Sequence, residues 1–198
     1  GVAGRRPVGV VRVLGVRPRY PEQVEHGVEV RHVHRGVGLG ADDVTALAEA
    51  GASVVWCPES NRNLYGATAD VRALLSAGVR VGLGSDSPVS GVRDALSNLA
   101  AAAREGVAEG AELIALATRG AGAVARLPVG GLAPGDRADL LAVSSAEALL
   151  AGERSAVLRV LREGRPVYGE PALVRAGMRG FDALRVDGQP RLLAHGLG

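Results

Sequence analysis

The sequence contains no lysine, and cysteine, methionine, tryptophan and phenylalanine each occur once among its 198 residues. Without lysine the chain can form neither a Schiff-base lysine nor a carboxylated lysine that bridges two metal ions. The single cysteine, Cys57, excludes an intramolecular disulfide and suits a reducing compartment, so we expect a cytoplasmic protein. No run of about 18 uninterrupted apolar residues occurs, and the first residues do not resemble a signal peptide. We therefore expect a soluble, folded protein with no membrane partner.

Basic charge is concentrated at the amino-terminal end. Residues 1–35 hold seven arginines against three glutamates, a balance of +4, whereas the whole chain has a formal net charge of +2. A basic arm that binds phosphate is one interpretation of this segment. Its only aromatic residue is Tyr20, so it offers little surface on which bases could stack. We expect no nucleic-acid partner and leave residues 1–29 as an unassigned basic segment.

Strands and helices alternate from Val28 onward. The hydrophobic pattern predicts strands over residues 28–34, 52–57 and 79–84, with helices over residues 42–50 and 70–77 between them. The second and third strands are continuous apolar runs, which is typical of strands buried on both faces. Strand, helix and strand repeat with a period near 27 residues, which indicates a parallel sheet with crossover helices. Pro58 is expected to end the second strand, and a polar loop is expected to follow it.

The predicted secondary structure changes from helices to short strands near Pro128. Two alanine-rich helices are predicted before it, over residues 92–104 and 111–125. Short strands are predicted after it, over residues 139–143, 156–162, 166–168, 183–186 and 190–193, with hairpin turns at Gly164-Arg165 and Asp187-Gly188. The fold class is therefore α/β, with a parallel α/β unit over residues 30–127 and a β-rich module over residues 128–198.

The third strand ends in the most specific chemical signal, Gly-Leu-Gly-Ser-Asp-Ser-Pro, whose aspartate is Asp86. In parallel α/β barrels the catalytic groups stand at the carboxyl ends of strands. Small residues before Asp86 let a ligand approach, and its carboxylate can bind a cation or take a proton from water. The alternative is that Asp86 caps a following helix, with Ser85 or Ser87 sharing that role. The spacing alone does not decide between these interpretations.

Polar residues near the other two strand ends are further candidates. His32 and His34 stand two apart, so on a strand they share a face, as two metal ligands do, although a surface pair explains them as well. Asn61, with Ser60 and Asn63, follows the second strand and can hydrogen-bond a ligand or cap a turn.

Residues 36–143 resemble the carboxyl half of the amidohydrolase superfamily, in the branch that holds cytosine and guanine deaminases, adenosyl-type deaminases and triazine hydrolases. Four ordered phrases carry the resemblance, and they lie at residues 51–58 with Ser60 and Asn61, 74–86, 117–121 and 131–140. The segment from Val160 to Tyr168 is similar to the closing hairpin of that family. The resemblance implies a partial TIM-type barrel, comprising its last strands, followed by part of a small β-sandwich.

The same resemblance assigns roles to the candidates. Asp86 matches the family's eighth-strand aspartate, which binds the catalytic metal and relays a proton. His34 lies one residue before the position of the sixth-strand histidine, where Arg35 stands, so it reaches the site only through a local bulge. Asn61 and Ser87 are expected to contact substrate. The implied cofactor is zinc or another divalent metal.

Two hypotheses follow. The first is a metal-dependent hydrolase of non-peptide carbon–nitrogen bonds, acting on a nitrogen heterocycle or an amide-like small molecule. The metal ligands of the family's earlier strands have no counterpart in residues 1–29, so we expect a carboxyl-terminal part that is inactive alone and does not hold the metal fully. We also expect a homo-oligomer, or association with a missing amino-terminal half. The second hypothesis is a non-catalytic fragment that acts as an assembly or binding module. A nucleotide-binding doubly wound fold is disfavoured, because no glycine fingerprint follows a strand.

Overall fold

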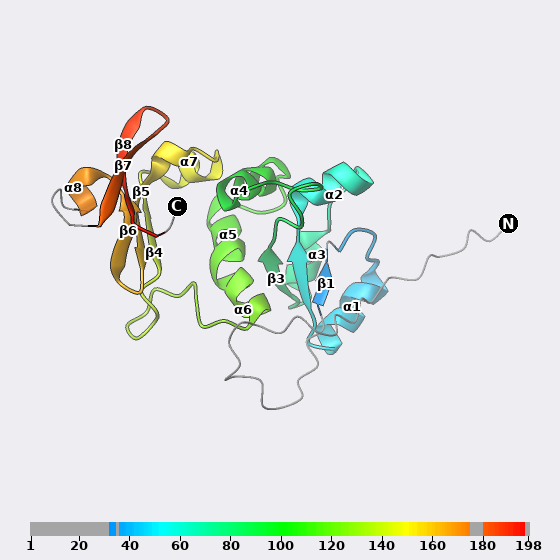
Figure 1. Cartoon of the computed structure of the whole chain (residues 1–198). Coiled ribbons are helices and arrows are strands. Elements are labelled where there is room, and N and C mark those ends of the chain that lie inside the picture. Colours follow the sequence, from blue (N-terminus) through cyan, green and yellow to red (C-terminus); the bar gives the residue numbers. More distant parts are fainter. Residues whose placement is uncertain (1–31, 35, 175–179, 197–198) are drawn as a thin grey trace.

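The structure is a computed structural model that describes residues 32–34, 36–174 and 180–196. Helices and strands mix along the described chain, which confirms the predicted α/β class. Two sheets are present in these ranges, one of three parallel strands and one of five antiparallel strands. Helices α4 and α5 lie between the two sheets (Figure 1).

The parallel sheet has the strand order β1-β2-β3, formed by His32–His34, Ser53–Trp56 and Arg80–Leu83. Ser53 pairs with Arg80, an offset of 27 residues that matches the predicted repeat. Val54 and Trp56 are fully buried on one face of β2, while Val55 on the other face is half-buried. The predicted parallel pairing is confirmed. Of the first predicted strand, residues 28–31 lie outside the described ranges.

Crossover helices follow each strand. Helix α1 (Ala41–Glu49) joins β1 to β2, and α2 (Pro58–Tyr65) and α3 (Val71–Ser76) join β2 to β3. Asp43 accepts a hydrogen bond from the Gly40 amide at the start of α1, which satisfies an otherwise orphaned donor. The predicted polar loop after Pro58 is wrong, because residues 58–65 are helical. Proline is tolerated in the first turn of a helix, so Pro58 ends the strand and begins α2.

After β3 the chain runs through two further helical segments. Helix α4 (Ala95–Arg104) begins after its cap, Asp94, and the next helical segment comprises α5 (Gly110–Ala115), the π-helical turn η2 (Leu116–Gly120) and α6 (Ala121–Ala125). The backbone stays in the right-handed helical region across both junctions, so the predicted helix over residues 111–125 is confirmed with a π-helical turn inside it. Gly82 permits this packing, because a Cβ there would lie 2.9 Å from the Ala121 Cα atom.

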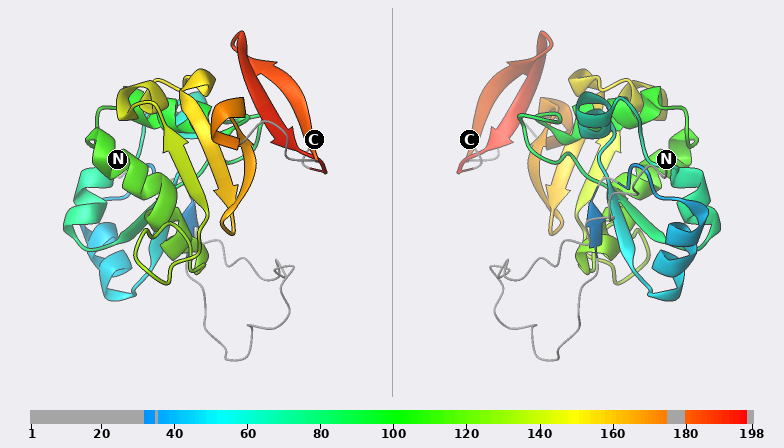
Figure 2. Two further views of the ribbon diagram at one scale, coloured as in Figure 1. Left: turned by 90° about the vertical axis from the view of Figure 1, so that its left-hand side faces the viewer. Right: turned by 90° about the vertical axis from the view of Figure 1, so that its right-hand side faces the viewer.

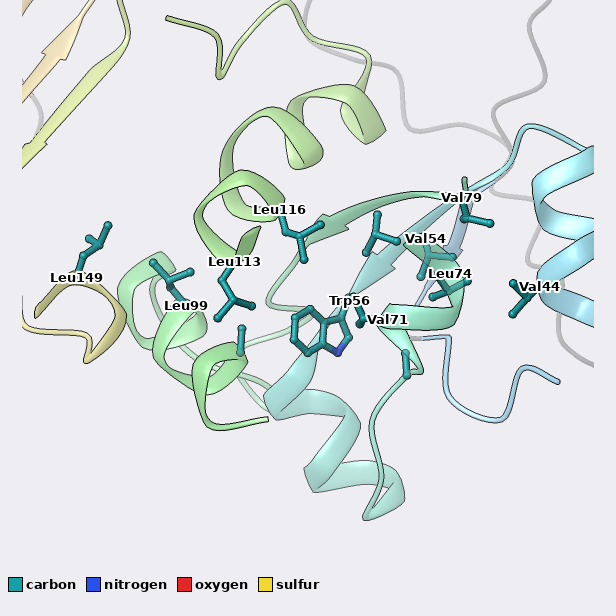
Figure 3. Packing of buried hydrophobic residues seen from close by; sticks show 13 residues of the cluster. Val44, Val54, Trp56, Val71, Leu74, Val79, Leu99, Leu113, Leu116 and Leu149 are labelled. Atoms are coloured by element: carbon teal, nitrogen blue, oxygen red, sulfur yellow. The ribbon is translucent and has the colours of Figure 1, made fainter. Parts of the chain in front are cut away.

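The main core lies between the parallel sheet and its helices. Trp56 is completely buried at its centre, between Leu113 and Leu116 on one side and Val71 on the other (Figure 3). Its indole nitrogen donates a 2.7 Å hydrogen bond to the Thr68 hydroxyl, so burial leaves that donor satisfied. Leu149 of the following module joins the same cluster. Trp56 and Cys57 are buried, as predicted.

The antiparallel sheet has the order β4-β5-β6-β8-β7. Its strands are Leu140–Val143, Val157–Arg162, Arg165–Gly169, Phe181–Val186 and Gln189–Ala194, numbered β4 to β8 along the chain. Both predicted hairpins are confirmed. The turn of the last hairpin is Asp187-Gly188, as predicted, whereas the turn of the first is Glu163-Gly164, one residue earlier than predicted, and all four residues are left-handed. The last hairpin extends away from the other elements in both views of Figure 2.

Short helices connect strands of this sheet, two of them between β4 and β5 and one between β6 and β7. They are α7 (Ala146–Leu150), the 3-10 turn η3 (Arg154–Ala156) and α8 (Pro171–Val174). An ion pair of 2.8 Å joins Arg154 to Asp94 at the start of α4. Across the described ranges, no helix has both the length and the apolar character needed to cross a membrane.

Candidate functional site

Asp86 stands just beyond the carboxyl end of β3, which closes at Leu83. Its φ angle is +60°, a left-handed conformation that is uncommon for a residue other than glycine. Such outliers concentrate at functional sites, where the surrounding structure holds them in place. Gly91 closes the same loop, since a Cβ at that position would lie 1.9 Å from the Ser85 carbonyl oxygen. The loop therefore presents Asp86 through a backbone that leaves no room for a larger residue at position 91.

Two serine hydroxyls donate hydrogen bonds to the same carboxylate oxygen of Asp86. The Oγ atoms of Ser60 and Ser90 lie 2.7 Å and 2.8 Å from Oδ2 of Asp86. Hydroxyl-to-carboxylate bonds are among the stronger hydrogen bonds in proteins. Asp86 does not cap the next helix, because Asp94 is the cap of α4 and accepts from the Ser97 amide. The capping interpretation of Asp86 is therefore wrong.

Helix α2 carries Ser60 and is fixed from two directions. Arg62 forms a two-point ion pair with Glu105 at the end of α4, with 2.7 Å from Nε to Oε1 and 2.6 Å from Nη2 to Oε2. The hydrogen bond to Glu105 raises the pKa of the Arg62 guanidinium above its usual value. The Asn63 amide donates a 2.8 Å bond to the Ser90 carbonyl oxygen, which ties α2 to the Asp86 loop. The ends of β2 and β3 therefore form one connected polar cluster.

Asn61 and Ser87 take different places in this cluster. Asn61 is completely buried on α2, with its Nδ2 atom 3.5 Å from the Thr68 hydroxyl. In this location Asn61 can stabilise the chain that follows β2. Ser87 is exposed beside Asp86, and its hydroxyl lies 3.0 Å from that of Ser90. Ser87 is therefore the more accessible of the two predicted substrate contacts.

His34 lies at an earlier level than Asp86 along the direction of the strands. His34 pairs with Val55, and Val55 pairs with Gly82, so these three residues form one row across the sheet. In β3 this row lies at Gly82, four residues before Asp86 in the sequence. The exposed His34 helps to line a cavity of about 300 Å³ together with Val55, Gly82 and residues of α6. The pairing of β1 shows no bulge through His34, and Arg35 lies outside the described residues. The described chain thus places His34 on the cavity side of the sheet and within a regular strand.

The described ranges contain no group of three or more histidine, cysteine, aspartate or glutamate residues that could hold a metal ion. Catalytic zinc needs about three protein ligands together with water. The metal ligand assigned from the sequence, the Asp86 carboxylate, lies within the described residues. By themselves they do not fit a complete zinc site.

Comparison with known proteins decides the family. The model of the amidohydrolase family matches residues 18–167, which is most of the chain. The chain belongs to the amidohydrolase family. It is 36% identical over 145 residues to a 5-methylthioadenosine/S-adenosylhomocysteine deaminase of Halobacterium salinarum, and this alignment covers 68% of the chain and 33% of that protein. It is 37% identical over 117 residues to an 8-oxoguanine deaminase of Pseudomonas aeruginosa, covering 53% of the chain and 25% of that protein.

Solved structures support the amidohydrolase fold. An adenosine deaminase from Xanthomonas campestris with bound zinc superposes with a TM-score of 0.61 and 27% identity, covering 68% of the chain and 36% of that protein. Guanine deaminase from E. coli gives a TM-score of 0.59 at 23% identity, covering 71% of the chain and 39% of that protein, and shows a shared fold. The chain spans about a quarter to two fifths of the length of these four relatives.

Sequence reasoning missed Ser90 and placed Ser60 in a loop. Ser90 stands four residues after Asp86, and its signal was the Ser-Pro-x-Ser turn, in which a second serine can fold back toward the first. The contact from Ser60 joins residues 26 apart. Sequence spacing carries no signal for such a contact until β2 and β3 are known to be neighbours.

Proposed function

We propose that this amidohydrolase chain forms part of a metal-dependent hydrolase of non-peptide carbon–nitrogen bonds, with an amino-substituted nitrogen heterocycle as substrate. The observation that carries the proposal is Asp86, held at the carboxyl end of a parallel strand by two hydroxyls. The names of the curated relatives support it, because they are deaminases of purine-containing compounds. In such a reaction water adds to the ring carbon that bears the amino group, the carbon–nitrogen bond breaks, and ammonia leaves.

The proposed domain organisation follows the two sheets. Residues 30–127 correspond to the last strands of a TIM-type barrel, residues 128–198 to part of a β-sandwich, and residues 1–29 to an unassigned basic segment. The parallel register of β1, β2 and β3 supports the first assignment. The antiparallel five-stranded sheet supports the second. Barrel strands place their catalytic groups at the carboxyl ends, which is where Asp86 stands.

In the proposed reaction Asp86 accepts a proton from the attacking water and returns it to the leaving nitrogen. The two hydroxyl donors hold Oδ2 of that carboxylate in place. Ser87 contacts the substrate from the exposed loop. We keep His34 and Asn61 as proposed contacts of the substrate. His34 reaches it only if the chain departs from the regular strand beyond it, and Asn61, which is completely buried, reaches it only if α2 shifts.

We propose zinc or another divalent metal as the cofactor, with Asp86 as a ligand. The related adenosine deaminase from Xanthomonas campestris has bound zinc, which supports this proposal. The described residues do not complete such a site, so the remaining ligands must come from other residues. We also propose a cytoplasmic location, and a chain that works as a homo-oligomer or in association with an amino-terminal half.

The experiment is to assay ammonia release from 5'-methylthioadenosine, guanine and a triazine, using the full-length product of the gene and the 198-residue chain. We expect release by the full-length product after zinc loading. We expect none from the 198-residue chain, with weak zinc binding by elemental analysis and an oligomeric mass, or poor solubility, by light scattering. A monomeric 198-residue chain that holds one zinc and releases ammonia would overturn the proposed division. A full-length product that releases no ammonia from any of the three would count against deamination and favour the assembly-module hypothesis.

A further inference from the structure

Ser60 is a buried hydroxyl whose partner lies on another element. Its side chain is 1% exposed on α2, and its Oγ atom donates 2.7 Å to Oδ2 of Asp86, which is 26 residues further along the chain. A buried hydroxyl costs free energy unless it is hydrogen-bonded. The cost at Ser60 is offset by a bond to a residue of the proposed site.

A serine inside a helix can bond the carbonyl four residues earlier, but Ser60 lies in the first turn of α2. The carbonyl four residues before it belongs to Trp56 of β2 and accepts a 2.8 Å bond from the Gly84 amide. The hydrogen-bond partner of the Ser60 hydroxyl is the carboxylate of Asp86.

The helix itself gives Ser60 little freedom to move. On one side of Ser60, Glu59 pairs with Arg104 at 3.0 Å. On the other side, Arg62 pairs with Glu105, whose side chain is only 7% exposed. Both pairs attach α2 to the end of α4, so the Ser60 donor is set in place before any ligand binds. A donor fixed in this way orients its acceptor at little further entropic cost.

Ser90 donates to the same oxygen, but from a different kind of support. It lies in the Asp86 loop, at 2.8 Å from Oδ2, and its backbone carbonyl is held by Asn63. Ser90 belongs to the same loop as Asp86 and is tied to α2 through Asn63, whereas Ser60 lies on α2 itself. Ser60 is therefore the direct contact between α2 and the Asp86 carboxylate.

We propose that Ser60 is a positioning residue, which holds Oδ2 of Asp86 so that the carboxylate is aimed out of the strand ends. This inference rests on the proposed function, since it gives Asp86 the reacting role. Ser60 itself touches neither substrate nor the reacting atoms. Its removal lets the carboxylate rotate and lowers the rate of the chemical step without weakening substrate binding.

The first test compares kinetics in the zinc-loaded full-length gene product. We expect Ser60→Ala to lower kcat about tenfold to a hundredfold, as loss of a partner that orients a ligating side chain does, with KM unchanged. Ser60→Thr keeps the donor and recovers most of kcat. The matched control is Ser53→Ala, which deletes another buried hydroxyl at the start of β2, one that accepts a 3.3 Å bond from Arg80. Ser53→Ala leaves kcat at the wild-type value, even if thermal stability falls.

The second test reads the orientation of Asp86 without any reaction. In isotope-labelled protein, three-bond couplings from the Asp86 carboxyl carbon to the backbone report its χ1 rotamer. We expect one rotamer in the wild type and in Ser53→Ala, and averaged couplings in Ser60→Ala. Unchanged couplings in Ser60→Ala would overturn the positioning role, whatever the activity.

The two arms separate this inference from the proposed function. If the wild type releases ammonia and Asp86→Ala does not, but Ser60→Ala keeps the wild-type kcat, the positioning role is wrong and the proposed function stands. If Asp86→Ala keeps full activity, the proposed function of Asp86 is wrong, and the coupling measurement alone decides whether Ser60 orients it.

Discussion

Arg62 and Glu105 hold each other in a two-point ion pair, with Nε to Oε1 at 2.7 Å and Nη2 to Oε2 at 2.6 Å. The Glu105 side chain is 7% exposed, so this pair links an exposed arginine to a largely buried acid. It fixes α2, and with it Ser60, against α4. Removal of the arginine leaves a buried charge without its partner, which costs more than the loss of an exposed pair.

We therefore expect Arg62→Ala to lower the midpoint of thermal unfolding more than Arg104→Ala does. Arg104 pairs with Glu59, whose side chain is 32% exposed, so its carboxylate is hydrated when the arginine is removed. Circular dichroism at neutral pH and low salt measures both midpoints. Equal shifts in the two variants would show that the Arg62 pair does not anchor α2 more strongly than an exposed pair.

Gly91 closes the Asp86 loop through steric demand. A Cβ atom at this position would lie 1.9 Å from the Ser85 carbonyl oxygen, which is backbone and cannot rotate aside. We expect Gly91→Ala to lower the free energy of unfolding by about 1–3 kcal/mol, the range of overpacked sites. Urea unfolding measures this, and amide chemical shifts should move most at Ser85 and Asp86. A wild-type unfolding curve would contradict the tight loop.

Asp94 predicts a dependence of stability on pH. The Ser97 amide and the Arg154 guanidinium lower the pKa of Asp94 from 3.8 to about 2. Because the folded pKa lies below the unfolded one, the stabilisation is present above about pH 4 and is lost as the pH falls toward 2. We expect Asp94→Ala to cost about 1 kcal/mol at pH 6, as loss of a helix cap does. The difference from wild type should shrink at pH 2.5. Urea unfolding at both pH values is the measurement, and a constant difference would refute the charge-based account.

His34 tests how far the site reaches down the sheet. If the imidazole contacts substrate or the attacking water, we expect His34→Ala to lower kcat/KM of the zinc-loaded full-length product about a hundredfold, as loss of an acid–base group does. Thr45→Ala, on the exposed face of α1, is the control and should keep wild-type kinetics. Wild-type kinetics in His34→Ala would remove His34 from the site.

Local sequence rules were enough for most elements of the fold. Strands β2 and β3 have near-continuous apolar runs, and the hairpins have glycine at a left-handed turn position, so each could be placed from a few neighbouring residues. Helix α2 was missed because Pro58 was interpreted as a stop. The fixed φ of proline can end a strand and also suits the first turn of a helix, so Pro58 alone does not tell the two apart. The ion pairs that attach α2 to α4 join residues far apart in the sequence, so the pattern around Pro58 gives no sign of them.

The site was less predictable than the fold. Asp86 could be proposed because a single aspartate after small residues marks a strand end. The hydrogen bond from Ser60 to Asp86 could not be predicted, since a loop and not a helix was expected after Pro58. The metal ligands are harder still, because catalytic zinc takes about three protein ligands and the sequence pattern identifies one of them, Asp86.

The central claim is that Asp86 is the reacting carboxylate of an amidohydrolase site. The measurement that tests it most directly is the rate of ammonia release from 5'-methylthioadenosine and guanine by the zinc-loaded full-length product, for wild type, Asp86→Ala and the control Asp42→Ala. Asp42 is exposed in the first turn of α1 and far along the chain from the strand ends. We expect Asp86→Ala to lose at least about a hundredfold in kcat, with a wild-type circular dichroism spectrum and with Asp42→Ala unchanged. Wild-type rates in a folded Asp86→Ala protein would contradict the account.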